Sequence, residues 1–564
     1  MKNPQTLDEI QNFQGKYPRQ LWYLFLVEMW ERFTFYGMRA LLGLYISHLV
    51  LSANYNPLPS TAMANKKAEF FKLNSEVLDE SHPRFYIETS QQMFRDAAEG
   101  KSNKQYGLIQ AFIYAMAFVG GLFADKLFGS RKSVFWGGIL MAIGTFTMAL
   151  PGSFPFYLGV SILIVGNGFF KPNISTMVGA LYKDGDSRKN AGFSLFYSGI
   201  NIGALLSGLT IAYIGTSVSW SLGFALSGVC MLAGLGLFMY TQKTLGPIGL
   251  PPNPELLRQV TKLGLSRNLV YLLGTLLFIP FFFGLVYFPF DLDLTFLLGP
   301  VSSVDGSIAP NLVPFSDVFM IGIAILILVY LVYILFGVKK EEFGKLLVAI
   351  LLILFSTLFW SFFEQGGGSL NFFANGNVQN HGLNMTQVNN SINALWVVLL
   401  APLIGFLWIW LGKKNSEPNT IVKFGFGFIF LGLGFLVFYG TKFLSDSQGY
   451  TPLWTFAFAY LVITIGELCL SPIGLSMVTT LSPKRLTGMM MGVWFLASAY
   501  GQYGAGLIGA ALAEGEGASK NLTNYEKLLQ YTEGYGSIGF VALGAGVVLI
   551  LISPVLRKQM QEVK

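Results

Sequence analysis

Long apolar stretches that recur along the whole chain constrain its fold more than any other feature. A helix needs about 20 largely apolar residues to cross a bilayer, and we predict fourteen such spans. Only 12% of the residues are charged, against about 25% in a soluble globular protein. The sequence therefore predicts an all-α polytopic membrane protein. The predicted spans cover residues 21–50, 105–127, 133–150, 155–182, 190–214, 218–241, 268–290, 314–338, 344–366, 391–413, 421–441, 451–479, 487–512 and 534–556.

The basic residues of the short loops fall in every second loop. Loops 151–155, 215–219 and 372–394 contain no Lys or Arg, whereas the loops that alternate with them are basic. Because cytoplasmic loops carry an excess of Lys and Arg, we expect the basic loops and both termini on the cytoplasmic side. The net charge of +7 then reflects topology rather than nucleic-acid binding.

Two irregular regions divide the chain. Residues 52–104 are polar and are predicted to form an outside loop or cap with an accessory role. Residues 242–343 combine a Pro- and Gly-rich linker with two spans that contain no charge near their middle. Without that pair, six spans remain in residues 1–241 and six in residues 344–564. Two six-helix bundles around a midplane cavity are the major facilitator architecture.

Four ionisable residues lie inside the first predicted span, namely Glu28, Glu31, Arg32 and Arg39. A charge at that depth costs about 2.5–3.5 kcal/mol on insertion scales and usually marks a substrate or ion pathway. Positions 28, 32, 35 and 39 share one face of a helix. Lipid cannot solvate that face, so we predict that it points into protein or water.

Several chemistries are disfavoured by what the chain contains. Cys230 and Cys469 both lie in apolar segments, and His48, His82 and His381 lie at span ends or in loops. The sequence has no clustered metal ligands and no phosphate-binding Gly-Lys-Ser/Thr motif. We therefore expect no enzyme activity, no metal and no cofactor. Any proton coupling is expected to use carboxylates rather than histidine.

Several motifs carry a family resemblance. The loop G-L-F-A-D-K-L-F-G-S-R-K (121–132) is similar to the signature loop of the major facilitator superfamily. Five further motifs resemble those of its proton-coupled oligopeptide transporter (POT) family: E-M-W-E-R-F-T-F-Y (28–36), G-N-G-F-F-K-P-N (166–173), F-S-L-F-Y-S-G-I-N-I-G-A-L (193–205), F-F-E-Q-G (362–366) and G-E-L-C-L-S-P-I-G-L-S (466–476). The two extra spans are typical of bacterial members. The resemblance implies a bacterial cell-membrane symporter of protons with di- and tripeptides, acting as a monomer by alternating access.

The resemblance also implies a peptide site shared by the two halves. Arg32 and Lys171 would receive the peptide carboxylate, since a guanidinium suits a carboxylate. Glu467 would hold the peptide amine. The side chains expected to hydrogen-bond the peptide are Tyr36, Tyr114 and Asn201.

Proton coupling and gating are implied in the same way. Glu28 and Glu31, beside Arg32, would couple substrate binding to proton movement. Ion pairs Arg39–Glu364 and Lys171–Glu467 would close an outside gate, which protonation of Glu364 would open. Asp125 and Arg131 would pair to latch the cytoplasmic gate.

Two departures and several alternatives stay open. Phe35 stands where the family often has a second tyrosine, and the glycine run 366–368 could be a hinge or a close backbone approach. The charges could instead be static packing pairs, and Lys171 could simply precede a proline kink at Pro172. The motifs also do not select the solute. Nitrate, a peptide-like drug, or a receptor that binds peptide without transport are the alternatives.

Overall fold

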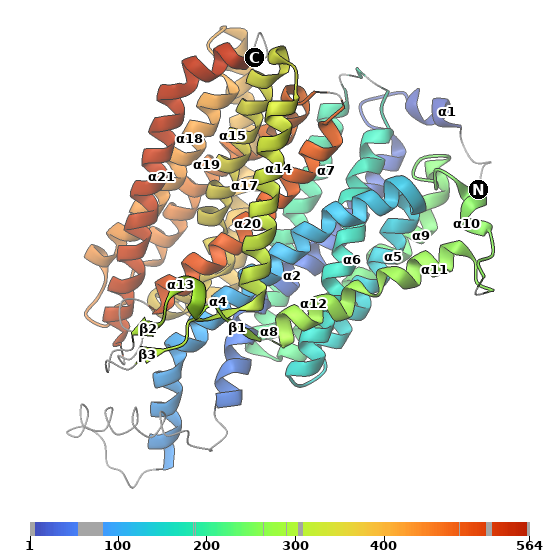
Figure 1. Cartoon of the computed structure of the whole chain (residues 1–564). Coiled ribbons are helices and arrows are strands. Elements are labelled where there is room, and N and C mark those ends of the chain that lie inside the picture. The colour runs from blue at the N-terminus through green and yellow to red at the C-terminus, as the bar shows by residue number, and fades with distance from the viewer. Residues whose placement is uncertain are drawn as a thin grey trace.

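The structure is a computed structural model that describes residues 6–54, 83–183, 185–186, 188–262, 264–288, 290–302, 308–483, 485–514 and 522–560. Most of the described part of the chain is helical (Figure 1). Eleven helical segments among the described residues are long and apolar enough to cross a membrane, and one of them, Ala98–Met148, contains most of α4 and all of α5. Every predicted span lies on a helix or on a short series of helices, as expected for a polytopic membrane protein.

The first part of the chain forms one helical bundle. Its apolar side chains pack into a continuous core that includes Leu41, Phe112 and Phe169. The helices are α1 (Leu7–Gln11), α2 (Arg19–Asn54), α4 (Pro83–Phe123), the π-helix η1 (Ala124–Phe128), α5 (Gly129–Met148), α6 (Ser153–Ala180), α7 (Arg188–Ser207), the π-helix η2 (Gly208–Ala212), α8 (Tyr213–Ser217) and α9 (Trp220–Thr241).

The linker contributes two further membrane-length elements at the periphery. The first is broken into two helices near Leu276, and both elements bury only a small share of their apolar windows. Short antiparallel strands join them, with Asp291 opposite Pro314. The elements are η3 (Gln242–Leu245), α10 (Pro254–Arg258), α11 (Arg267–Thr275), α12 (Phe278–Tyr287), β1 (Asp291–Asp293), α13 (Thr295–Leu298), β2 (Val301–Ser302), β3 (Ile308–Ala309), β4 (Leu312–Pro314) and α14 (Phe315–Gly337).

The last part of the chain forms the second bundle, beside the first (Figure 1). Its core is a separate apolar cluster that includes Phe359, Phe435 and Tyr535. The helices are α15 (Lys340–Phe363), the 3-10 helix η4 (Glu364–Gly367), α16 (Ser369–Asn377), α17 (Met385–Lys413), α18 (Thr420–Gly440), the 3-10 helix η5 (Thr441–Leu444), α19 (Leu453–Leu481), α20 (Thr487–Glu514) and α21 (Asn524–Met560).

The polar stretch 52–104 is less loop-like than its composition predicts. Helix α2 continues to Asn54, and α4 begins at Pro83, well before the predicted start of its span. The reason is packing against the second bundle: Glu99 and Asn103 are buried, and the Asn103 amide donates a 3.1 Å hydrogen bond to the Gly509 carbonyl of α20. Polar residues are therefore compatible with a helix here. Residues 55–82 of this stretch lie outside the described residues.

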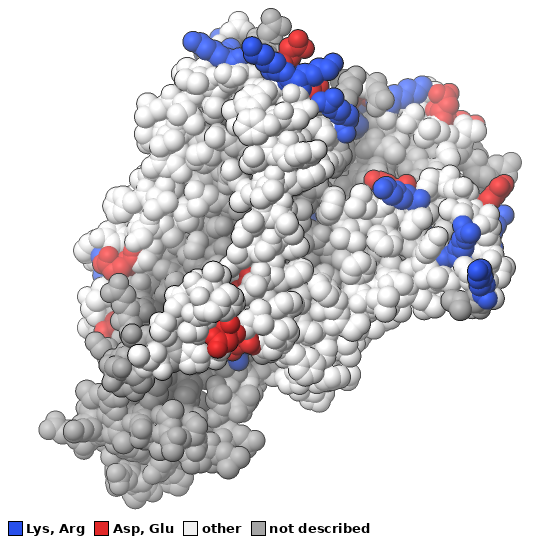
Figure 2. Space-filling view, viewed as in Figure 1, with Lys and Arg blue, Asp and Glu red and all other residues white. Residues whose placement is uncertain are grey.

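The two ends of the molecule differ in charge. Lys and Arg side chains gather at one end, which we call the basic end (Figure 2). Both α1 and the last turns of α21 lie there (Figure 1). The opposite end is the one where α16 finishes and α21 begins. There the side chain of Asn384, the residue just before α17, donates 2.8 Å hydrogen bonds to Thr216 and Ser217 of the first bundle, so the bundles are joined at this end.

Candidate functional site

Helix α2 lines a cavity between the two bundles. Glu28, Arg32, Tyr36 and Arg39 all face this cavity. Their spacing of four, four and three residues keeps them on one side of a helix. The helix face expected from the sequence contained Phe35, whereas the face that lines the cavity contains Tyr36. Phe35 is fully buried instead, and the Arg32 guanidinium carbon lies 5.2 Å from its ring centroid.

Glu28 and Arg32 belong to a compact buried charge cluster on α2 that also includes Glu31. Arg32 Nε lies 3.1 Å from a Glu28 carboxylate oxygen and forms a second ion pair with Glu31. Glu31 does not line the cavity, and its carboxylate accepts a 3.0 Å hydrogen bond from the Asn167 amide of α6. Among the described residues, Arg32 Nη2 has no hydrogen-bond partner. The cluster therefore contains a buried guanidinium donor that no described residue uses.

Three predicted substrate contacts lie in the same cavity. Lys171 projects from α6 one residue before Pro172, and its ammonium sits 3.9 Å from the ring centroid of Tyr114 on α4. Asn201 of α7 lines the cavity and donates a 3.0 Å hydrogen bond to the Tyr197 carbonyl. The ring face of Tyr114 attracts the cation, which holds the ammonium in the cavity wall.

One predicted gate contact joins the two bundles. Arg39 of α2 forms an ion pair with Glu364 of η4, and Arg39 Nε donates a 2.6 Å hydrogen bond to the Tyr106 hydroxyl. Gly367 allows this approach, since a Cβ there would collide with the Tyr106 hydroxyl and lie 3.0 Å from Arg39 Nη2. Of the two interpretations of the glycine run, the structure supports close backbone approach at this position.

The other predicted ion pairs are absent from the described residues. Lys171 and Glu467 both line the cavity but form no ion pair. The Glu467 carboxylate instead accepts a 3.0 Å hydrogen bond from Asn393, which keeps it on the second bundle. Asp125 and Arg131 do not pair either.

Arg131 binds the linker instead of the acid expected for it. Its guanidinium donates to the Gly246 carbonyl, and its backbone N–H donates to the Gly249 carbonyl at 2.9 Å. Asp125 is exposed in the π-helical turn η1. Neither residue lines the cavity. The motif therefore identified Arg131 as a structural residue, but its partners are backbone carbonyls of the linker rather than Asp125.

Sequence reasoning missed a row of polar residues on α17. Asn389 donates a 2.8 Å hydrogen bond to the Gly366 carbonyl and accepts a 2.7 Å bond from the Tyr460 hydroxyl. Asn393, one turn further along, also bonds Thr464 at 3.1 Å. Asparagines one helical turn apart beside an apolar stretch were the available signal, but the predicted span began at residue 391.

In the cavity, positive charges of the first bundle face negative charges of the second bundle. Its volume is ≈ 310 Å³, near the lower end of about 300–1,000 Å³ for small-molecule sites. Arg32 and Lys171 are on one wall, and Glu467 with its supporting asparagine is on the other. Such a site can hold a small molecule with an anionic and a cationic end. Within the described residues, no group of three or more His, Cys, Asp or Glu side chains is placed to hold a metal ion.

Comparisons with known proteins give consistent matches. Residues 131–526 match the model of the POT family. A peptide transporter of Yersinia enterocolitica, YePEPT, is 32% identical, with 87% of this chain and 88% of that protein aligned. The uncharacterized transporter YclF of Bacillus subtilis is 31% identical over 97% of this chain and 96% of its own length.

Solved structures are similar over nearly the whole chain. A crystal structure of a peptide transporter POT with sulfate has a TM-score of 0.71 and 29% identity, covering 98% of this chain and 97% of that one. A POT family transporter with 5-aminolevulinic acid has a TM-score of 0.71 and 27% identity, covering 98% of this chain and all (100%) of the other.

Proposed function

This chain belongs to the POT family, and from that premise we propose that it imports di- and tripeptides together with protons by alternating access. Two relatives that align over 95–97% of their length are named a dipeptide and tripeptide permease and a di-/tripeptide transporter. The observation that carries the proposal is the cavity, in which unlike charges from the two bundles face a space of ≈ 310 Å³.

The peptide termini match the two walls of the cavity. Arg32 has an unpartnered Nη2 donor among the described residues, and Lys171 adds a second positive charge, so they receive the carboxylate. Glu467, held by Asn393, receives the amine. Tyr36, Tyr114 and Asn201 hydrogen-bond the peptide backbone. An extended di- or tripeptide spans at most about 7–11 Å, which favours short peptides in a small cavity.

Protons enter the cycle through the carboxylates near Arg32 and Arg39. Protonation of Glu364 would neutralise it and break its ion pair with Arg39, so the opposite end could open. Glu28 and Glu31 share Arg32 as their counter-ion. A peptide carboxylate that competes for Arg32 weakens that pairing and favours protonation of one of the two acids. Substrate and proton binding are thereby coupled.

Orientation follows from charge. Because Lys and Arg gather at the basic end, that end is cytoplasmic and the opposite end faces outward. The protein then lies in a bacterial inner membrane with both termini inside, and works as a monomer without a cofactor. The proton gradient supplies the free energy for uptake.

Uptake by reconstituted protein tests this proposal. Purified protein in liposomes would be given labelled dialanine with and without an inward proton gradient. We expect accumulation only with the gradient. Glu31→Gln should retain counterflow of dialanine but lose accumulation, because exchange needs no net proton transfer. Glu255→Gln, in the exposed first turn of α10, is the matched control and should behave as wild type.

Three results would change the assignment. Binding of dialanine without uptake or exchange would indicate a receptor. Dialanine uptake that is the same with and without the proton gradient would contradict proton coupling. If dialanine neither binds nor moves, nitrate, larger peptides and peptide-like drugs would be screened, since one family member was crystallised with 5-aminolevulinic acid rather than a peptide.

A further inference from the structure

The linker helices form an apolar groove away from the central cavity. Phe123 at the end of α4 forms one side, and Val270, Gly274, Leu277 and Phe281 follow the groove along α11 and α12. Its volume is ≈ 600 Å³ and its lining is almost wholly apolar. Leu277 is 73% exposed, so the groove opens to the surroundings of the protein rather than into its core.

The groove has the length of one membrane leaflet. Val270 and Phe281 are eleven residues apart, which corresponds to about 16 Å at about 1.5 Å per helical residue. Half of the roughly 30 Å hydrocarbon core of a bilayer is about 15 Å. Helix α11 starts at the basic end, so the groove runs from that membrane surface towards the midplane. An acyl chain of the leaflet at the basic end fits both its depth and its chemistry.

The mouth of the groove is positively charged. Lys132 of α5 donates a 2.9 Å hydrogen bond to the Asn268 side chain at the start of α11. Arg267 is the first residue of α11, and Lys126 is exposed shortly after Phe123. Figure 2 shows Lys and Arg side chains over α10 and the start of α11. The exposed Asp125 in the turn η1 offsets only part of this positive charge.

From this combination we propose that the groove binds an anionic phospholipid of the leaflet at the basic end. Lys132 and Arg267 hold the headgroup phosphate, and one acyl chain lies along Val270, Gly274 and Phe281. Basic clusters where helices meet the cytoplasmic membrane surface select anionic headgroups. The lipid fills the space between α4 and the linker helices and so fixes the linker helices to the first bundle. This inference does not depend on which solute is transported.

Lipid binding to the purified full chain tests the site directly. Native mass spectrometry and thermal unfolding would be measured with phosphatidylglycerol and with phosphatidylcholine of the same chains. We expect phosphatidylglycerol to bind roughly tenfold more tightly, because its headgroup has a net negative charge, whereas choline offsets the phosphate charge of phosphatidylcholine. Lys132→Gln and Arg267→Gln should each weaken its binding roughly fivefold and should weaken phosphatidylcholine binding by a smaller factor, since that headgroup also carries a phosphate. Lys413→Gln, at the basic end of α17, is the charge control and should have no effect.

A variant that fills the groove distinguishes lipid binding in the groove from non-specific attraction of anionic lipids to the basic end. A Cβ at Gly274 meets no atom within 4 Å, so Gly274→Leu can occupy the groove without disturbing the fold. Gly284→Leu on α12 is the matched control, because its Cβ is equally unobstructed. We expect only Gly274→Leu to abolish the stabilisation by phosphatidylglycerol. Equal binding of the two lipids, or wild-type phosphatidylglycerol binding by Gly274→Leu, would overturn the proposal. If Gly274→Leu does not fold, the two charge variants decide.

Discussion

The opposite end and the basic end of this protein use their polar residues differently. At the opposite end, side chains cross from one bundle to the other: Glu99 of α4 lies 3.5 Å from the Lys527 ammonium of α21 and accepts a 3.0 Å hydrogen bond from Tyr531. At the basic end, Arg485 pairs with Glu342 inside the second bundle at 2.9 Å. Contacts that cross a boundary hold the bundles together, whereas contacts within a bundle let it move as a unit.

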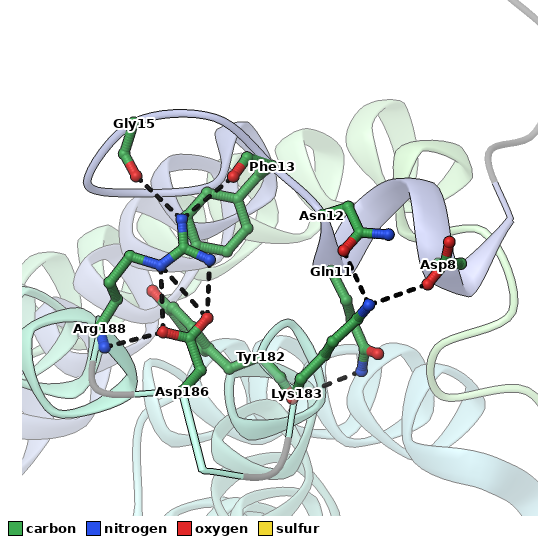
Figure 3. A network of polar contacts seen from close by, with 9 residues as sticks. All are labelled: Asp8, Gln11, Asn12, Phe13, Gly15, Tyr182, Lys183, Asp186 and Arg188. Atoms are coloured by element: carbon green, nitrogen blue, oxygen red, sulfur yellow. Dashed lines mark hydrogen bonds and ion pairs between the residues drawn. The ribbon is translucent and has the colours of Figure 1, made fainter.

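At the basic end, a set of contacts between residues 8–15 and residues 182–188 holds the N-terminal segment against the first bundle, and we call this set the brace (Figure 3). The Arg188 guanidinium donates to the Phe13 and Gly15 carbonyls at 3.1 Å each, and its carbon lies 3.9 Å from the Phe13 ring centroid. Asp186 holds the same guanidinium through a 2.7 Å ion pair. Lys183 binds Asp8 at 3.0 Å. All these residues belong to the first bundle, so this end can separate from the second bundle without breaking them.

A substitution that disrupts the backbone contact between α4 and α20 should destabilise the closed opposite end more than any other change proposed below. A Cβ on Gly506 of α20 would lie 2.7 Å from Gly107 Cα and 2.8 Å from the Asn103 carbonyl oxygen of α4. Backbone cannot move aside, so Gly506→Leu should destabilise the closed opposite end by about 3 kcal/mol. Spin labels at Val218 and Tyr450 should then move apart.

The matched control for that variant is Gly236→Leu on α9, whose Cβ meets no atom within 4 Å. It should leave the distance between the spin labels unchanged. An unchanged distance in Gly506→Leu as well would mean that the α4–α20 contact does not hold this end closed.

The buried pair of Glu99 and Lys527 should have the next largest effect. Both side chains are nearly buried, at 5% and 11% exposure. Lys527→Met should shift the equilibrium towards opening of this end by about 2 kcal/mol, the usual cost of losing a hydrogen bond to a charged group. The same spin-label distances would measure it. A double-mutant cycle with Glu99→Gln isolates the pair, and additive effects would contradict direct coupling.

The linker helix α14 also takes part in the closed end, with a smaller expected effect. Its Asp317 lies 2.7 Å from Lys104 of α4 and accepts a 2.8 Å hydrogen bond from Tyr503 of α20. Because the Lys104 side chain is 38% exposed, Asp317→Asn should cost only about 1 kcal/mol. Thermal unfolding and the spin-label distances should both respond. Asp293→Asn, on an exposed strand, should change neither measurement.

The brace at the basic end should not respond to pH in the range where a proton-coupled transporter works. Hydrogen bonds from Arg188 hold the pKa of Asp186 below its ordinary value of 3.8. A lowered carboxyl pKa stabilises docking above the ordinary value, and this stability is lost as the pH falls through the lower value. The protection factors of residues 7–15, which compare the exchange rates with those of the unfolded chain at the same pH, should therefore be constant from about pH 8 to about pH 5. Asp186→Asn should speed this exchange at neutral pH. Undocking near pH 6 in wild type would contradict the assignment.

The span pattern was predictable from the sequence because it follows local rules. Long apolar stretches require helices in a membrane, and the predicted spans all coincide with helices. The polar start of α4 was missed for the same reason. Composition marks it as a loop, yet the buried Asn103 finds its partner on α20, more than 400 residues away. A distant partner of this kind leaves no local signal.

The candidate site was predictable in its residue types but not in all its pairings. Charges inside the first span identified Arg32, and the family resemblance identified Lys171 and Glu467, and all three line the cavity. The predicted pair Lys171–Glu467 does not form among the described residues, where Asn393 on the same bundle is the hydrogen-bond partner of the acid. Tyr36 lines the cavity in place of Phe35, since the helix turns 100° per residue and the seam lies one residue further on.

The sequence by itself determined which segments are helices, which charges must avoid lipid and which family the motifs resemble, because each of these depends on residues close together in the chain. Only the tertiary structure decided which of the expected charge pairs form, which end of the molecule is closed and where the linker helices leave a groove. Those properties depend on how two separately packed bundles lie against each other. The interfaces between them bring together residues such as Arg39 and Glu364, which are far apart in sequence.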